Sequence, residues 1–173
     1  RGTTLVLVDV DPYKFRGVRV GRNEKKGNAG DVIIVNKNPW VEEDKARPDD
    51  VFWDMIGHEV GHARELDKKT YKLTDDEIND LSQAYYDRAT PGNQKRLKDK
   101  DGNFNEYARS EAIATFIGRV FRNRKARIQL NIKNPTLFDH IVDAFQKIIG
   151  TYKLSPSQQA VVDDFLALKK ERE

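Results

Sequence analysis

The chain contains no cysteine, which excludes disulfide bonds, thiolate metal ligands and a cysteine nucleophile. It is also poor in histidine, with only 3 in 173 residues. No apolar run approaches the roughly 20 residues that a membrane-spanning helix needs, so we expect no membrane span. A metal site or catalytic centre in this chain must therefore be built from a few histidines, carboxylates and hydroxyl groups.

The composition, with 38% hydrophobic and 34% charged residues, is typical of a globular protein with a highly charged surface. We expect a single domain over residues 1–173, mostly β in 1–48 and mostly helical in 49–173. The chain begins Arg1-Gly2-Thr3, with neither an initiator methionine nor a signal peptide. We therefore expect an excised domain or processed product that lacks its targeting signal.

Two of the three histidines belong to Gly57-His58-Glu59-Val60-Gly61-His62-Ala63, a complete H-E-x-x-H motif. Histidines four residues apart project from one face of a helix, where both imidazoles can bind a single tetrahedral Zn²⁺. Glu59 between them can then act on a metal-bound water. The alternative is an accidental histidine pair on an amphipathic helix. The motif favours a zinc hydrolase.

The helix that carries this motif is predicted to begin at Asp49-Asp50 and to end near 67–69. Apolar residues occupy most of its circumference, so the two imidazoles lie in a mostly apolar setting and need a bonding partner. Gly61 costs about 1 kcal/mol relative to alanine in a helix interior. We therefore expect a close packing contact at Gly61.

Elsewhere the pattern predicts three strands followed by helices. Strands are expected over 5–10, 15–21 and 31–36. Helices are expected from a capping box at 74–77 to about 88, over about 105–124, and after the cap-proline pairs at 134–135 and 155–156. These elements predict an α+β fold in which a small N-terminal β-sheet packs on a mainly helical body.

A catalytic zinc usually has three protein ligands, and the best third candidate is Glu111. On the predicted helix, Glu111 shares a stripe with Tyr107, Ala114 and Gly118. This stripe predicts that its carboxylate points inward among small residues, which is costly unless the group is paired or metal-bound. The alternative is a carboxylate that the helix dipole stabilises or that pairs with Arg109 or Arg119.

An H-E-x-x-H helix and a later helix with a glutamate followed by small residues resemble the gluzincin branch of the zincin metallopeptidases. The long gap between segments 57–63 and 107–116 is similar to that in lethal-factor-like peptidases and in bacterial effector and polymorphic-toxin peptidases. In lethal-factor-like enzymes a tyrosine precedes the ligand glutamate by two helical turns. Here that position is Phe104, and Tyr107 lies one turn before Glu111.

This resemblance and the chemistry together imply a zinc-dependent endopeptidase with a zincin-like body and one Zn²⁺ per chain. His58, His62 and Glu111 would bind the metal. Glu59 would take a proton from the zinc-bound water and pass it to the leaving amine. The resemblance also implies a toxin or effector domain of a larger bacterial protein, secreted or delivered into a target cell, that acts on a protein or peptide.

Two further parts of the site are expected. The donor to the oxyanion is expected to be Tyr107, with His140 and Arg109 as alternatives. The alternative interpretation of Tyr107 is a core aromatic residue. The alternative interpretation of His140 is a histidine on a helix surface. In zincins an edge strand beside the motif helix pairs with the extended substrate. The strand expected in this role consists of Val32, Ile33, Ile34 and Val35.

A basic stretch follows Glu111, because no acidic residue occurs again before Asp139. Its cations are Arg119, Arg122, Arg124, Lys125, Arg127 and Lys133. We expect these cations to lie on a solvated helix end and loop. A nucleic-acid patch is less favoured, because no aromatic residues for base stacking are interleaved with the cations. The alternative function is a zincin-fold regulatory or binding protein that acts with nucleic acid through this stretch.

Overall fold

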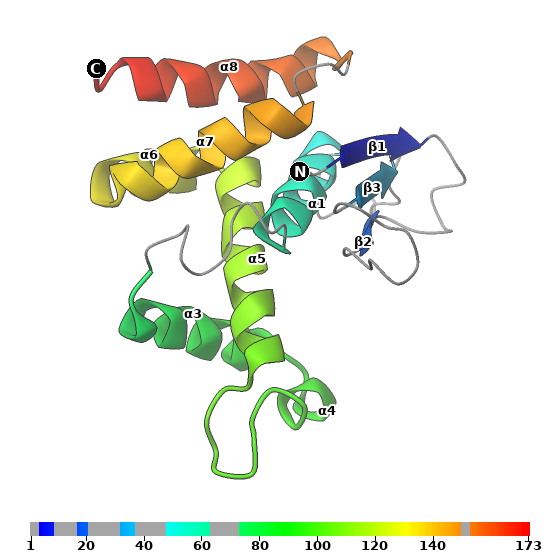
Figure 1. The fold of residues 1–173 in the computed structure, drawn as a ribbon, viewed down its shortest axis with the longest axis vertical. Helices are drawn as coiled ribbons and strands as arrows, with labels where there is room; N and C mark the ends of the chain where they lie inside the picture. The colour runs from blue at the N-terminus through cyan, green and yellow to red at the C-terminus, as the bar shows by residue number, and fades with distance from the viewer. Residues whose placement is uncertain (1–3, 9–16, 21–31, 37–47, 63–72, 150–152) are drawn as a thin grey trace.

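The computed structural model describes residues 4–8, 17–20, 32–36, 48–62, 73–149 and 153–173. The elements in chain order are β1 (Thr4–Val8), β2 (Gly17–Val20), β3 (Val32–Asn36), α1 (Pro48–His62), α3 (Asp75–Arg88), α4 (Pro91–Gln94), α5 (Glu106–Arg122), α6 (Arg124–Lys133), α7 (Pro135–Ile149) and α8 (Pro156–Lys170). Helix α5 runs through the middle of the molecule, with α6, α7 and α8 at one end and α3 and α4 at the other (Figure 1). Helix α1 packs along α5 more extensively than any other element does.

The prediction of an α+β fold is wrong, because the described residues are mostly helical. The three strands have only 5, 4 and 5 residues. Strands this short span roughly 13–17 Å and cover little more than one helix. Where the burial of a side chain is described, the fully buried apolar residues lie in the helices from Phe52 on and in the segment between α4 and α5. The helices therefore form the core.

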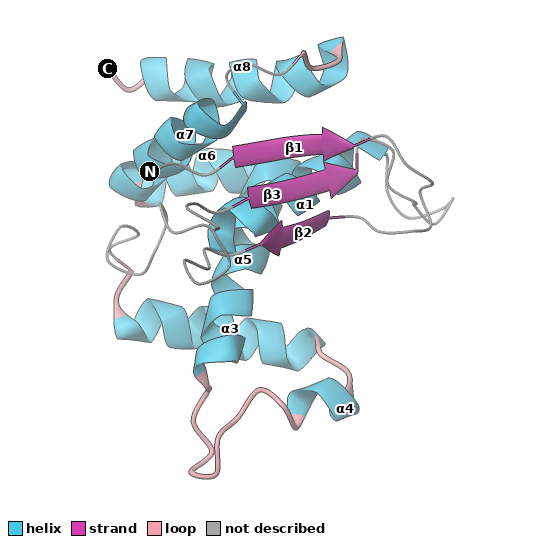
Figure 2. Ribbon diagram, turned by 45° about the vertical axis from the view of Figure 1, so that its right-hand side comes forward, coloured by secondary structure: helices cyan, strands magenta, loops and turns pink. Residues whose placement is uncertain are grey.

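The short strands are arranged in the order β1-β3-β2, beside α1 (Figure 2). Strand β3 pairs in parallel with β1 and antiparallel with β2, so that Ile34 is opposite both Val6 and Val18. A strand flanked on both sides uses both of its backbone edges. The prediction that Val32, Ile33, Ile34 and Val35 form an edge strand that pairs with substrate is therefore wrong.

The helix starts follow local capping signals in the sequence. Thr74 Oγ1 accepts a hydrogen bond from the backbone N–H of Glu77 at 3.2 Å, and the Glu77 carboxylate accepts one from the backbone N–H of Thr74 at 2.7 Å. Asn105 caps α5, and Ser155 caps α8 in a second capping box. The predicted capping box at 74–77 is confirmed, as are the helix starts after 134 and 155.

The basic stretch covers the last turn of α5, which agrees with the expected helix end, and the whole of α6, where a loop was expected. Asn123 ends α5 and its side chain caps α6 by accepting a hydrogen bond from the backbone N–H of Ala126. Arg127 is buried, donates to the backbone carbonyl of Phe121, and pairs with Asp164 of α8 at 2.9 Å. Arg124 pairs with the same carboxylate at 2.8 Å. These structural roles do not favour the nucleic-acid alternative.

A cluster of buried aromatic rings joins α1 and α5 to the C-terminal helices. The Phe121 ring of α5 lies 4.9 Å from that of Phe145 on α7 and 5.1 Å from that of Phe165 on α8, measured between ring centroids. Trp53 of α1 lies 5.5 Å from Phe145 in an edge-to-face arrangement. Such pairs contribute about 0.5–1.5 kcal/mol each beyond their burial. This aromatic cluster fixes one end of the α1–α5 pair.

Candidate metal centre

Helices α1 and α5 cross backbone to backbone where glycine and alanine residues meet. A Cβ atom built on Gly61 would lie 2.6 Å from the Cα of Ala114, and one on Gly57 would lie 2.8 Å from the Cα of Gly118. Real Cβ atoms essentially never approach this closely. The close packing contact predicted at Gly61 is therefore confirmed. This contact brings the side chains of Ser110 and Glu111 on α5 within reach of the histidines on α1.

Three potential metal ligands meet at this crossing. His62 Nε2 lies 3.1 Å from Glu111 Oε1, and His58 Nε2 lies 3.5 Å from Glu111 Oε2. The two Nε2 atoms are 3.2 Å apart. The side chains are partly accessible, at 30% for His58, 15% for His62 and 20% for Glu111. The Glu111 carboxylate thus faces both imidazoles from the neighbouring helix, as its stripe predicts.

These distances fit a tetrahedral metal site. Bonds of about 2.0–2.2 Å place two tetrahedral ligand atoms about 3.3–3.6 Å apart, and the three observed separations are 3.1, 3.2 and 3.5 Å. One proton can be shared between the two facing nitrogens as an N–H···N hydrogen bond, whereas a bound cation would take the lone pairs of both nitrogens and leave neither as a donor. Within the described part of the chain, these three residues are the only group of this kind. The donor set of two imidazoles and one carboxylate suits Zn²⁺.

Ser110 supports one of the imidazoles from α5. Its Oγ lies 3.1 Å from His62 Nδ1. When Nδ1 carries the proton and donates it to the hydroxyl oxygen, Nε2 keeps a free lone pair that faces Glu111. Sequence reasoning did not identify Ser110, because a serine next to a candidate ligand has no distinctive spacing of its own.

The local electrostatics favour the protonation states that bind metal. A hydrogen bond with His62 lowers the pKa of Glu111 below its usual value, against the opposing effect of burial and together with the charges of His62 and His58. Burial lowers the pKa of His58, as does His62, while Glu111 and Asp54 act in the opposite direction. An ionised carboxylate and a neutral imidazole are the forms that ligate zinc.

The remaining predicted catalytic residues are placed differently. Glu59 lies in α1 next to His58, but its side chain falls outside the part of the structure that can be described. Tyr107 lies in the first turn of α5 and is 51% exposed, so it is not a core aromatic residue. His140 is half-buried in α7 and is not part of the metal-ligand group.

Arg109 has a structural partner. Its Nη2 donates to Asp75 Oδ1 at 2.7 Å, which ties the start of α5 to the start of α3. This ion pair makes Arg109 a poor candidate for the oxyanion donor, because its guanidinium group is already engaged by Asp75.

Tyr85 of α3 is a residue near the candidate site that sequence reasoning did not consider. It is half-buried, and its pKa is raised by burial first, and then by the charges of Glu111 and Tyr107. Its phenol is therefore close enough to Glu111 to interact electrostatically with the metal-ligand group. Tyr85 has no signal in the sequence, since only the packing of α3 on α5 brings it there.

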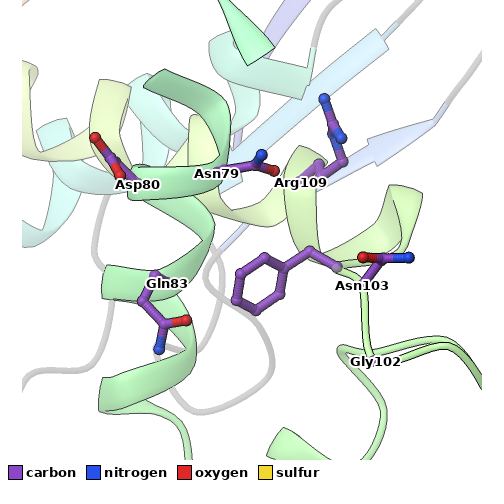
Figure 3. A pocket seen from close by; sticks show the side chains of 7 residues that line it. Asn79, Asp80, Gln83, Gly102, Asn103 and Arg109 are labelled. Carbon is purple, nitrogen blue, oxygen red and sulfur yellow. The ribbon is translucent and has the colours of Figure 1, made fainter. Parts of the chain in front are cut away.

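A separate hollow of about 480 Å³ lies between α3 and the loop before α5. Asn79 points from α3 toward Arg109 (Figure 3). The lining consists of Asn79, Asp80, Gln83, Gly102, Asn103, Phe104 and Arg109. None of the three metal-ligand candidates lines it, so this hollow is not part of the candidate metal centre.

Comparisons with protein-family models, with curated proteins and with solved structures found no match for this chain. No described helix is long and apolar enough to cross a membrane.

Proposed function

We propose that this chain is a zinc-dependent endopeptidase of the gluzincin type, with one Zn²⁺ held by His58, His62 and Glu111. The observation that carries the proposal is the convergence of these three side chains, whose ligand atoms all lie within 4.8 Å of one another. Glu59 strengthens it, because a metal site with a purely structural role does not require a carboxylate between the two histidines.

The bound zinc would supply a Lewis acid that polarises the attacking water and the scissile carbonyl. Glu59 would act as general base by accepting a proton from that water as its oxygen bonds to the carbonyl carbon. The same carboxyl group would then protonate the amine nitrogen as the C–N bond breaks. Ser110 would hold His62 in the tautomer whose Nε2 can ligate, as its contact with Nδ1 suggests.

A tyrosine hydroxyl would stabilise the oxyanion. Tyr107 is the candidate from the sequence, and Tyr85 joins it because burial, and then the charges of Glu111 and Tyr107, raise its pKa. Tyr85→Phe and Tyr107→Phe variants distinguish them. The variant that lowers kcat by about 10²–10³ with unchanged zinc content identifies the donor. If neither variant lowers kcat, the oxyanion is stabilised by another group.

The experiment that tests the proposal uses an unbiased substrate pool. The zinc-loaded chain is incubated with a cell proteome, and new protein N-termini are mapped by mass spectrometry. We expect cleavage that chelation removes and added zinc restores. Glu59→Gln is the matched control, since it should keep the zinc and the fold but lose most turnover. Equal cleavage by Glu59→Gln and the wild type would rule out the role assigned to Glu59, and no zinc-dependent cleavage at all would refute the peptidase.

We further propose, from the resemblance to effector and toxin peptidases alone, that the domain acts on proteins of a target cell after secretion or delivery. Expressing the chain inside bacterial and eukaryotic cells should impair growth of one of them, while Glu59→Gln should be tolerated. Equal growth with both forms in both hosts would count against a toxin.

A further inference from the structure

A second pocket opens beside the metal centre, between α1, α3 and α5. Its volume is about 180 Å³, below the roughly 300–1,000 Å³ of sites that hold whole small-molecule ligands. Asp54, one turn before His58 on α1, and Thr115, one turn after Glu111 on α5, both line it. One helical turn is about 5.4 Å, which an extended peptide covers in one or two residues. The pocket is thus within reach of a side chain close to the bond that would be cleaved.

The charged groups of this pocket are mostly guanidinium groups. Arg88 of α3 and Arg119 and Arg122 of α5 line it, against a single carboxylate, Asp54. Arg122 Nε lies 3.9 Å from Asp54 Oδ1, a long and partly solvated pair. Among the described residues, no carboxylate lies within ion-pair distance of Arg88 or Arg119. Within the described part of the chain, neither of these two guanidinium groups is engaged by a carboxylate.

The rest of the lining suits the stem of such a ligand. It is made of apolar and hydroxyl-bearing side chains, namely Leu81, Ala84, Tyr85, Ala112, Thr115 and Phe116. This lining, together with the exposed guanidinium groups of Arg88, Arg119 and Arg122, matches a side chain with a methylene stem and an anionic end. Arginine forks bind carboxylate or phosphate groups with two parallel hydrogen bonds, which adds geometric selectivity to charge.

We propose that this pocket is a specificity subsite that binds an anionic side chain of the peptide substrate, one or two residues from the scissile bond. The inference rests on the proposed peptidase function for its biological meaning. Binding of the anionic group itself requires no hydrolysis, so the two proposals can fail separately. The two sources of the anion are an acidic residue and a phosphorylated serine.

The test is an NMR titration of the full chain with blocked single amino acids: N-acetyl-glutamate amide, N-acetyl-phosphoserine amide and, as neutral control, N-acetyl-glutamine amide. We expect an anionic probe to shift the backbone amides of Arg88, Thr115 and Arg119, and to bind about tenfold more tightly than the glutamine probe. Arg119→Gln should lose this preference and keep its zinc. Lys125→Gln, which removes an exposed cation of α6 outside the pocket, should keep both.

The possible outcomes distinguish failure of the subsite from failure of the proposed peptidase function. Stronger binding of the glutamate or the phosphoserine probe supports the subsite and identifies the anion. Equal binding of all three probes, or an unchanged preference in Arg119→Gln, overturns it even when the chain is an active peptidase. A zinc-dependent cleavage map with anionic residues beside the cut site, and loss of that bias in Arg119→Gln, would join the subsite to the reaction. A working subsite without hydrolysis would instead refute only the proposed function.

Discussion

Helices α1 and α5 contact each other in two ways along their length, through large aromatic rings at one end and through small residues at the other. At one end Trp53 and Phe121 pack into a fully buried aromatic cluster with rings from α7 and α8. At the other end Gly61 meets Ala114 with almost no side chain between the backbones, and the partly accessible metal-ligand candidates lie beside this contact. The stabilising aromatic contacts and the metal-ligand candidates are thus separated along one helix pair. Large rings anchor it, and small residues allow a carboxylate on α5 to reach two imidazoles on α1.

The largest expected effect comes from the aromatic end. Phe165→Ala removes a fully buried ring that contacts Phe121, Phe138 and Phe145. It should lower the free energy of unfolding by about 3–5 kcal/mol, as measured by denaturant titration. If the comparison holds, the folded fraction should still bind zinc with wild-type stoichiometry. Loss of zinc from the folded variant would show that the two ends are not independent.

The next effect comes from the small-residue end. Gly61→Ala places a methyl group 2.6 Å from the Ala114 backbone, so the helices must move apart. Overpacking of this kind destabilises a fold by about 1–3 kcal/mol, and the shift should also weaken zinc binding at least tenfold. Gly92→Ala is the matched control, because a Cβ there meets nothing within 4 Å. Unchanged zinc affinity in Gly61→Ala would mean that the close crossing does not position the ligands.

A smaller and purely local effect is expected at Ser110. Ser110→Ala removes the hydroxyl that contacts His62 Nδ1. Loss of such a supporting group typically weakens metal binding by about 10–100-fold. Competition with a fluorescent zinc chelator measures this change, and circular dichroism should show an intact fold. Ser110→Thr keeps a hydroxyl and should restore most of the affinity. If the Ser110→Ala and Ser110→Thr variants bind zinc equally well, the hydroxyl group of Ser110 has no positioning role.

Features determined by neighbouring residues could be predicted from the sequence. The Thr74 capping box and the helix starts after Asn134 and Ser155 need only local chemistry. The orientation of Glu111 followed from a single helical stripe of small residues, which indicated where another helix could approach. The H-E-x-x-H spacing put both histidines on one face of α1 in the same way.

Features that depend on distant partners could not be predicted. Strand order is set by long-range pairing, so the central position of β3 was not visible in the residues 32–36 themselves. The α+β class failed because apolar runs indicate extended segments but not their share of the core. Arg127 is buried rather than solvated and pairs with Asp164, which is 37 residues away in the sequence. The charge of Glu111 adds to the effect of burial in raising the pKa of Tyr85 because α3 packs on α5, which the sequence does not show.

The central claim is that His58, His62 and Glu111 bind one zinc ion together. Its most direct test is a crystal structure of the zinc-loaded chain with anomalous scattering measured on both sides of the zinc absorption edge. We expect one zinc peak per chain, with the Nε2 atoms of both histidines about 2.0–2.1 Å from the metal and a Glu111 carboxylate oxygen about 2.0–2.2 Å from it. A well-folded chain without zinc at this position, or a zinc ion bound by both histidines while Glu111 points elsewhere, would contradict it.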